Sequence, residues 1–159
     1  MKLIAFDSGL ERTGWAVFDM DGRNYALLAY NCIFTSRDLP LSGRIYSLSS
    51  DVQNLVKLYQ PEEFVLEQLF FLANKKTAIQ VAQAQGAVLG IAGQHGIKVS
   101  FLTPPQIKSS LSGYGKTDKK GIQKMVSLLL HIDPLPTPDD TVDAIACGLT
   151  YCTMMKPNI

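Results

Sequence analysis

Two short apolar segments of the chain each end directly in an acidic residue. Leu3–Phe6 is followed by Asp7, and Phe64–Leu66 is followed by Glu67. Short apolar runs of this kind are typical of strands that are covered on both faces. Such strands need helices above and below them, and an acid at the strand end lies at the edge of the sheet. The two segments therefore predict an α/β fold in which carboxylates can gather at one sheet edge.

The remaining sequence supplies three more strands and enough helices to cover a sheet. Alternating patterns predict strands at 13–18, 24–34 and 98–102, and helical spacing predicts helices at 41–59, 74–94, 104–111, 118–130 and from 138 onward. The order is β-β-β-α-β-α-β-α-α-α, and its simplest packing is a mixed five-stranded sheet with helices on both faces. Because no repeat or linker divides the chain, residues 1–159 are expected to form one domain.

Local patterns predict finer details. Asp19–Gly22 has the composition of a hairpin turn. Thr137 can cap the last helix, with Pro138 at its first position. In the third strand, alternation places four residues on one face: Tyr25, Leu27, Ala29 and Asn31.

Composition limits the setting in which such a domain works. The chain is 47% hydrophobic and 18% charged, which is ordinary for a globular protein. No apolar run is long enough to span a membrane, so we expect a cytoplasmic protein. The spacing of Cys32, Cys147 and Cys152 matches no zinc pattern, and buried thiols are expected.

Basic residues are concentrated in the middle of the chain, although the net charge is only +1. Between Gln68 and Ile132 there are eight lysines and one acidic residue, Asp118. This distribution favours a surface that binds a polyanion beside a site that needs carboxylates. Lysines that merely keep the surface soluble would give the same count, and charge alone does not separate the two interpretations.

Asp140 and Asp143 add two acids to those at the strand ends. They are three residues apart at the start of the last helix and so share one face. Clustered carboxylates repel one another unless cations neutralise them, and oxygen ligands suit Mg²⁺ and Mn²⁺. Two such ions about 4 Å apart would support phosphodiester hydrolysis. Each acid also has a structural explanation, such as a turn or a favourable helix start, and Asp139 rivals Asp140 because it lies four residues from Asp143.

The residues between the acids suggest contacts with DNA. A predicted loop after Glu67 carries Phe70 and Phe71, of which one is expected to stack on an unpaired base and the other to be buried. Five lysines precede the acidic helix and can contact phosphates without reading sequence: Lys108, Lys116, Lys119, Lys120 and Lys124.

These motifs together resemble the RuvC family of Holliday junction resolvases over nearly the whole chain. The quoted segments are Ile4–Gly9 with Thr13-Gly14, Leu66–Phe70, Ala82–Gly86, Gln106–Lys108, Gly113–Gly115, Lys119–Val126 and Asp140–Ala146. Each motif alone is weak, whereas their order and spacing are specific. Two departures are Ser8, where the family usually has proline, and Lys116-Thr117, where small residues are usual.

The resemblance implies an RNase H-like fold and a homodimer that cuts opposed strands of a four-way DNA junction symmetrically. It implies that Asp7, Glu67, Asp140 and Asp143 hold two Mg²⁺ ions, with Mn²⁺ as a substitute. Phe70 would be the base-stacking aromatic residue, and Lys108 and Lys119 would assist cleavage. The RuvA–RuvB branch-migration proteins would be its partners.

A row of small residues on the long helix bears on dimerisation. Ala78, Ala82, Gly86 and Gly90 recur at every fourth position and permit close packing, either against the sheet or against a second subunit. Two active sites would suit a substrate with two-fold symmetry.

Other functions compete with this prediction. A nucleotide-binding protein of the actin and sugar-kinase type shares an Asp-x-Gly turn like Asp7–Gly9 but needs two such domains. A non-catalytic junction-binding module would keep the basic surface without needing all four acids. A nuclease acting on RNA–DNA hybrids would be distinguished by its substrate.

Overall fold

The computed structural model describes residues 1–22, 24–69, 75–113 and 117–155. The elements follow the predicted order: β1 (Lys2–Asp7), β2 (Arg12–Asp21), β3 (Asn24–Phe34), α1 (Leu41–Tyr59), β4 (Glu63–Glu67), α2 (Lys75–His95), β5 (Lys98–Leu102), α3 (Pro104–Ser112), α4 (Lys119–Leu130) and α5 (Asp139–Met154).

The five strands form one mixed sheet in the order β3-β2-β1-β4-β5. The pairs β1–β2 and β2–β3 are antiparallel, whereas β4 runs parallel to both β1 and β5. The predicted mixed five-stranded sheet is therefore confirmed. Because β1 and β4 are parallel neighbours, their carboxyl ends lie at the same edge.

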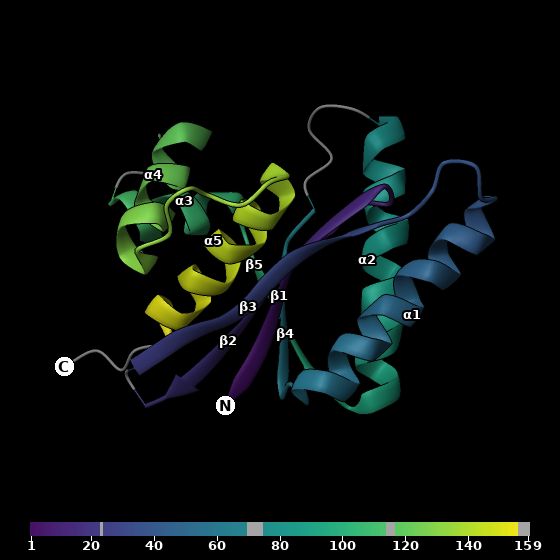
Figure 1. The fold of residues 1–159 in the computed structure, drawn as a ribbon, viewed down its shortest axis with the longest axis horizontal. Coiled ribbons are helices and arrows are strands. Elements are labelled where there is room, and N and C mark those ends of the chain that lie inside the picture. Colours follow the sequence, from purple (N-terminus) through teal and green to yellow (C-terminus); the bar gives the residue numbers. More distant parts are fainter. Residues whose placement is uncertain (23, 70–74, 114–116, 156–159) are drawn as a thin grey trace.

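Helices cover both faces of this sheet, as predicted. Figure 1 shows α1 and α2 on one side and α3, α4 and α5 on the other. Alternate residues of each central strand enter the two cores, so that Phe6 packs towards α1 and α2 while Ala5 packs towards α5. α5 is central to its layer, since Ile145 and Leu149 are fully buried in it.

The first hairpin is longer than the sequence predicted. β2 continues through Asp19 to Asp21, which pairs with Asn24. The prediction of a turn over Asp19–Gly22 was wrong for its first three residues, because pairing with β3 carries them on as strand. Gly22 has a φ of +58°, a conformation that glycine adopts readily, and the chain turns there.

A β-bulge changes the faces of β3. Val17 pairs with Ala29, whereas the next residue, Phe18, pairs with Leu27, so Leu28 is the extra residue. Tyr25 and Leu27 consequently pack with the α5 side of the sheet, and Ala29 packs with the α1–α2 side. The prediction that these residues share one face with Asn31 was wrong, since strict alternation cannot anticipate a bulge.

The row of small residues on α2 does not pack against the sheet. Ala82, Gly86 and Gly90 are exposed, and a Cβ atom added to either glycine would meet nothing within 4 Å. Ala84 and Val88, each two positions from members of the row, belong to the buried face instead. Of the two interpretations of this row, packing against the sheet is excluded.

Two compositional expectations bear on the core and on membranes. Cys32, Cys147 and Cys152 are all buried thiols, as expected. Within the described ranges, no helix combines the length and apolar character required to cross a membrane.

Candidate active site

The sheet brings the first two acids together at one edge. Phe6 pairs with Leu66 in the parallel β1–β4 ladder, so Asp7 and Glu67, each the next residue, end their strands side by side. The end of β4 is held from α2, because the Gln85 Nε2 donates a hydrogen bond of 3.0 Å to the main-chain oxygen of Glu67. Gln85 is buried, and its sequence signal was a polar residue on the inward face of the long helix.

The amino-terminal end of α5 supplies the other two acids and lies directly on β2. Gly14 pairs with Asp7 in the β1–β2 ladder. A Cβ atom on Gly14 would lie 1.9 Å from the main-chain oxygen of Asp140. Only glycine permits this approach, which places α5 beside Asp7.

The start of α5 differs from its predicted form. Pro138, not Thr137, is the N-cap residue, and no side chain caps the helix. The predicted Thr137 cap was wrong, and Asp139 and Asp140 become the first two helical residues. Their charges near the helix N-terminus favour the helix without a capping hydroxyl.

Burial and the neighbouring acids together raise the pKa of Asp7 to about 7. The largest cause is loss of hydration around the carboxyl group, followed by the negative charges of Asp143, Asp140 and Glu67. The pKa of Glu67 is also raised, by burial and by Asp143, while Lys108 opposes the shift. Burial likewise raises the pKa of Asp143, against the effect of Lys119. The structure therefore brings all four predicted acids into one electrostatic cluster.

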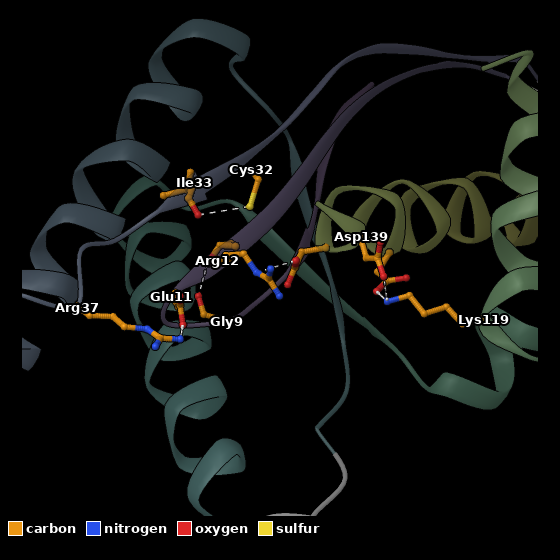
Figure 2. Close-up of polar contacts among 11 residues, drawn as sticks. Gly9, Glu11, Arg12, Cys32, Ile33, Arg37, Lys119 and Asp139 are labelled. Carbon is orange, nitrogen blue, oxygen red and sulfur yellow. Dashed lines mark hydrogen bonds and ion pairs between the residues drawn. The ribbon is translucent and has the colours of Figure 1, made fainter. Parts of the chain in front are cut away.

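Two basic side chains pair with the acids of α5. The Lys119 Nζ donates a hydrogen bond of 2.9 Å to Asp143 and lies 3.2 Å from Asp139. The Arg12 Nε lies 3.0 Å from the Asp140 Oδ2. Figure 2 shows Arg12 and Lys119 approaching the start of α5 from opposite sides. Arg12 was not predicted as a site residue because it lies outside the lysine-rich segment, although it opens the strand that pairs with β1.

Asp140 is better placed than its rival Asp139. The Asp139 side chain is 63% exposed and the Asp140 side chain 21%. Of the two, only Asp140 contributes to the raised pKa of Asp7. This geometry favours Asp140 over Asp139 as the third acid of the cluster.

A cavity of about 400 Å³ opens at the acids and receives part of the basic segment. Lys108 of α3 and Lys119 of α4 line it together with Asp7, Glu67 and Asp143. A second cavity of about 250 Å³ shares Asp7 and Glu67 but extends towards α2, where Ser8 and Gln85 line it. The acids thus lie between two hollows at the sheet edge.

The other predicted DNA-contacting residues are placed less directly. Lys120 and Lys124 are exposed on α4 and are absent from the described lining of either cavity. Phe70 and Lys116, like Phe71, lie outside the described residues.

The chemical type of the candidate ligands suits a hard divalent cation. All four candidate ligands are carboxylates, whose oxygen atoms suit such a cation. Their negative charges repel one another at Asp7, and a bound cation would reduce this repulsion. As the side chains lie, however, the described residues contain no group of three or more acidic, histidine or cysteine side chains ready to hold a metal. Asp140 and Asp143 are instead paired with Arg12 and Lys119.

The strand order, with acids at the ends of β1 and β4 and on the helix beside them, defines the RNase H-like class. Solved structures support this class. The structure of Thermus thermophilus RuvC matches 98% of this chain and 98% of that one, with a TM-score of 0.86 and 29% identity. A structure of the same protein in complex with a Holliday junction substrate matches 97% of this chain and 96% of that one, with a TM-score of 0.88 and 30% identity.

Sequence relatives specify the family within that class. The family model for crossover junction endodeoxyribonuclease RuvC matches residues 3–151. The crossover junction endodeoxyribonuclease RuvC of Fusobacterium nucleatum is 37% identical over 151 residues, which cover 95% of this chain and 80% of that protein. The chain belongs to the RuvC family of crossover junction endodeoxyribonucleases.

Proposed function

We propose that this chain is a Holliday junction resolvase, a homodimeric endonuclease that nicks opposed strands of four-way DNA junctions symmetrically during recombination and repair. The observation that carries the proposal is the cluster of Asp7, Glu67, Asp140 and Asp143 beside Lys108 and Lys119. The Thermus thermophilus relative, bound to a Holliday junction, supports the choice of substrate.

The four acids would hold two Mg²⁺ ions, or Mn²⁺ in their place. When bound, the ions supply an activated water and stabilise the leaving 3′ oxygen. Burial and then its acidic neighbours raise the pKa of Asp7, which would have to lose its proton to act as a ligand. Asp140 and Asp143 would have to leave Arg12 and Lys119 to act as ligands.

The basic side chains have separate tasks in this proposal. Lys108 and Lys119 line the cavity, where they hold and neutralise the scissile phosphate. Lys116, Lys120 and Lys124 contact the DNA backbone further from the acids, which fixes position without reading sequence. Phe70 stacks on a base at the opened junction.

The exposed face of α2 is the proposed dimer contact. Ala82, Gly86 and Gly90 are exposed small residues, and the exposed Ile79 adds apolar area to the same helix. A two-fold dimer would present two active sites to a two-fold junction. The RuvA–RuvB complex is the proposed partner, and the cytoplasm is the proposed location.

Single acid substitutions test the catalytic part of the proposal. Asp7→Asn, Glu67→Gln, Asp140→Asn and Asp143→Asn should each reduce junction cleavage to background, since each removes a candidate ligand. Binding of the junction in EDTA, measured by fluorescence anisotropy, should persist.

Asp139→Asn is the matched control, because this exposed neighbour carries the same charge on the same helix turn. It should retain most of the cleavage activity. Loss of activity in Asp139→Asn together with full activity in Asp140→Asn would show that the third acid is assigned wrongly. A variant that unfolds would identify a structural acid instead.

A further inference from the structure

Arg12 is a basic residue at the acid cluster to which the proposed mechanism gives no task on DNA. It opens β2 on the side of the cluster opposite Lys119 (Figure 2). Its guanidinium pairs with Asp140 while its side chain remains 51% exposed. Because the guanidinium is not buried, it can reach solvent or a molecule bound at the sheet edge.

The main chain at this ion pair is closely packed, whereas the Arg12 side chain is half exposed. Gly14, two residues beyond Arg12 in β2, lies against the main-chain oxygen of Asp140 so closely that a Cβ atom would not fit. The next helical residues, Thr141 and Val142, are buried. A carboxylate that leaves Arg12 therefore does so by rotating its own side chain, while α5 stays in place.

The pairing with Arg12 occupies a carboxylate that a divalent cation would need. Among the described residues, no three acids are arranged to hold a metal ion. In this arrangement Asp140 is paired with Arg12, and Asp143 is paired with Lys119. Asp140 is one of the negative charges that raise the pKa of Asp7. Arg12 and a divalent cation thus compete for the same negative charge.

We propose that Arg12 is a positioning residue that holds Asp140 in the free protein and moves to a backbone phosphate of the junction when a divalent cation takes Asp140. A guanidinium suits both partners. Here it reaches Asp140 through a single Nε–Oδ2 ion-pair contact of 3.0 Å, and on a phosphate it can form two parallel hydrogen bonds. In the absence of DNA, Arg12 partly neutralises the negative charge of the acid cluster. Because a cation on Asp140 releases Arg12 for a phosphate, cation binding and DNA binding are linked. This inference rests on the proposed function.

The first test measures cation binding without DNA. Mn²⁺ is titrated by calorimetry into the wild-type protein, Arg12→Ala, Arg12→Lys and Arg37→Ala. Arg12→Ala should bind Mn²⁺ about fivefold more tightly, the factor that corresponds to an exposed ion pair of about 1 kcal/mol. Arg12→Lys should return most of the way to the wild-type affinity, since it restores the positive charge.

Arg37→Ala is the matched control for this titration. Arg37 is a nearby arginine whose partner is Glu11, and it makes no ion pair with the acids of α5. It should leave Mn²⁺ affinity unchanged. Equal tightening in both alanine variants would mean that net charge alone is responsible, which would overturn the proposal.

The second test measures the salt dependence of junction binding. The slope of log affinity against log salt should be shallower by about one for Arg12→Ala than for the wild-type protein when Ca²⁺ is present, because one phosphate contact is lost. In EDTA the two slopes should agree, since Arg12 then remains on Asp140. Gels taken after each titration verify that the junction is intact.

The outcomes separate this proposal from the function on which it rests. If the wild-type protein cleaves junctions but Arg12→Ala binds Mn²⁺ unchanged and merely melts at a lower temperature, Arg12 is a structural ion pair and the proposal fails alone. If the wild-type protein binds no Mn²⁺ and cleaves no junction, the proposed function fails and the role of Arg12 fails with it.

Discussion

At the scale of single residues, the site is governed by how its clustered negative charge is compensated. Asp7 ends a central strand, where lost hydration and then three acidic neighbours raise its pKa to about 7. Arg12 and Lys119 compensate the α5 acids instead, through ion pairs of 3.0 Å and 2.9 Å. The protein thus tolerates four clustered acids partly by holding a proton and partly by placing two of its own cations.

The retained proton makes folding stability depend on pH. The pKa of Asp7 rises from 3.8 to about 7 on folding, so the folded state keeps a proton that the unfolded state loses between these values. The contribution of Asp7 is therefore complete below about pH 4, declines as the pH rises and is lost above about pH 7.

Asp7→Asn should remove this dependence. In EDTA, the variant should exceed the wild-type protein in free energy of unfolding at pH 8, and the difference should shrink towards pH 4. Urea unfolding at several pH values measures both curves. Parallel curves for the two proteins would contradict the assigned environment of Asp7.

At the scale of elements, the contact between β2 and α5 sets the geometry of the site. Gly14 lets the start of α5 touch the strand next to Asp7, and Gly148 lets the same helix pass over Phe18 and Ala5. The acids of α5 reach the sheet edge because these two glycines remove side chains from the interface.

Gly14→Ala should push α5 away from the sheet. The added methyl group meets main-chain atoms, and overpacking of this kind typically costs about 1–3 kcal/mol of folding stability. Cleavage should be lost even at temperatures where the variant is folded, because Asp140 and Asp143 move away from Asp7.

Gly93→Ala provides the control within a helix. A Cβ atom at this exposed position of α2 meets nothing within 4 Å, so the substitution should be neutral or stabilising by up to about 1 kcal/mol. Thermal unfolding of both variants measures the contrast. A Gly14→Ala protein as stable and active as the wild-type protein would show that the close contact is not required.

Most of these elements could be predicted because their signals are local. Apolar alternation located the strands at 24–34 and 98–102, a short apolar run located the strand that ends at Glu67, and helical spacing completed the order of the ten elements. The β-bulge at Leu28 and the ion pair of Arg12 with Asp140 could not be predicted, because both depend on which distant segments become neighbours. The proximity of Asp7 and Glu67 was predictable, because parallel strands bring their carboxyl ends to one edge of a sheet.

At the scale of the whole molecule, the proposed dimer makes a prediction that needs no DNA. Sedimentation velocity should show a dimer for the wild-type protein, and Ala82→Glu should yield a folded monomer because it places a charge on the exposed row of α2. Leu128→Glu, on the exposed face of α4 across the sheet, should remain dimeric. A wild-type monomer at micromolar concentration would contradict the proposed contact.

The most direct test of the central claim is cleavage of a mobile four-way junction labelled on two opposed strands. The protein is incubated with Mg²⁺ or with EDTA, and a linear duplex of the same sequence serves as the control substrate. A Holliday junction resolvase should give paired nicks in opposed strands of the junction with Mg²⁺, no nicks in EDTA and no cutting of the duplex. Tight binding of the junction without cleavage in Mg²⁺ or Mn²⁺ would contradict it and would favour a non-catalytic junction-binding protein.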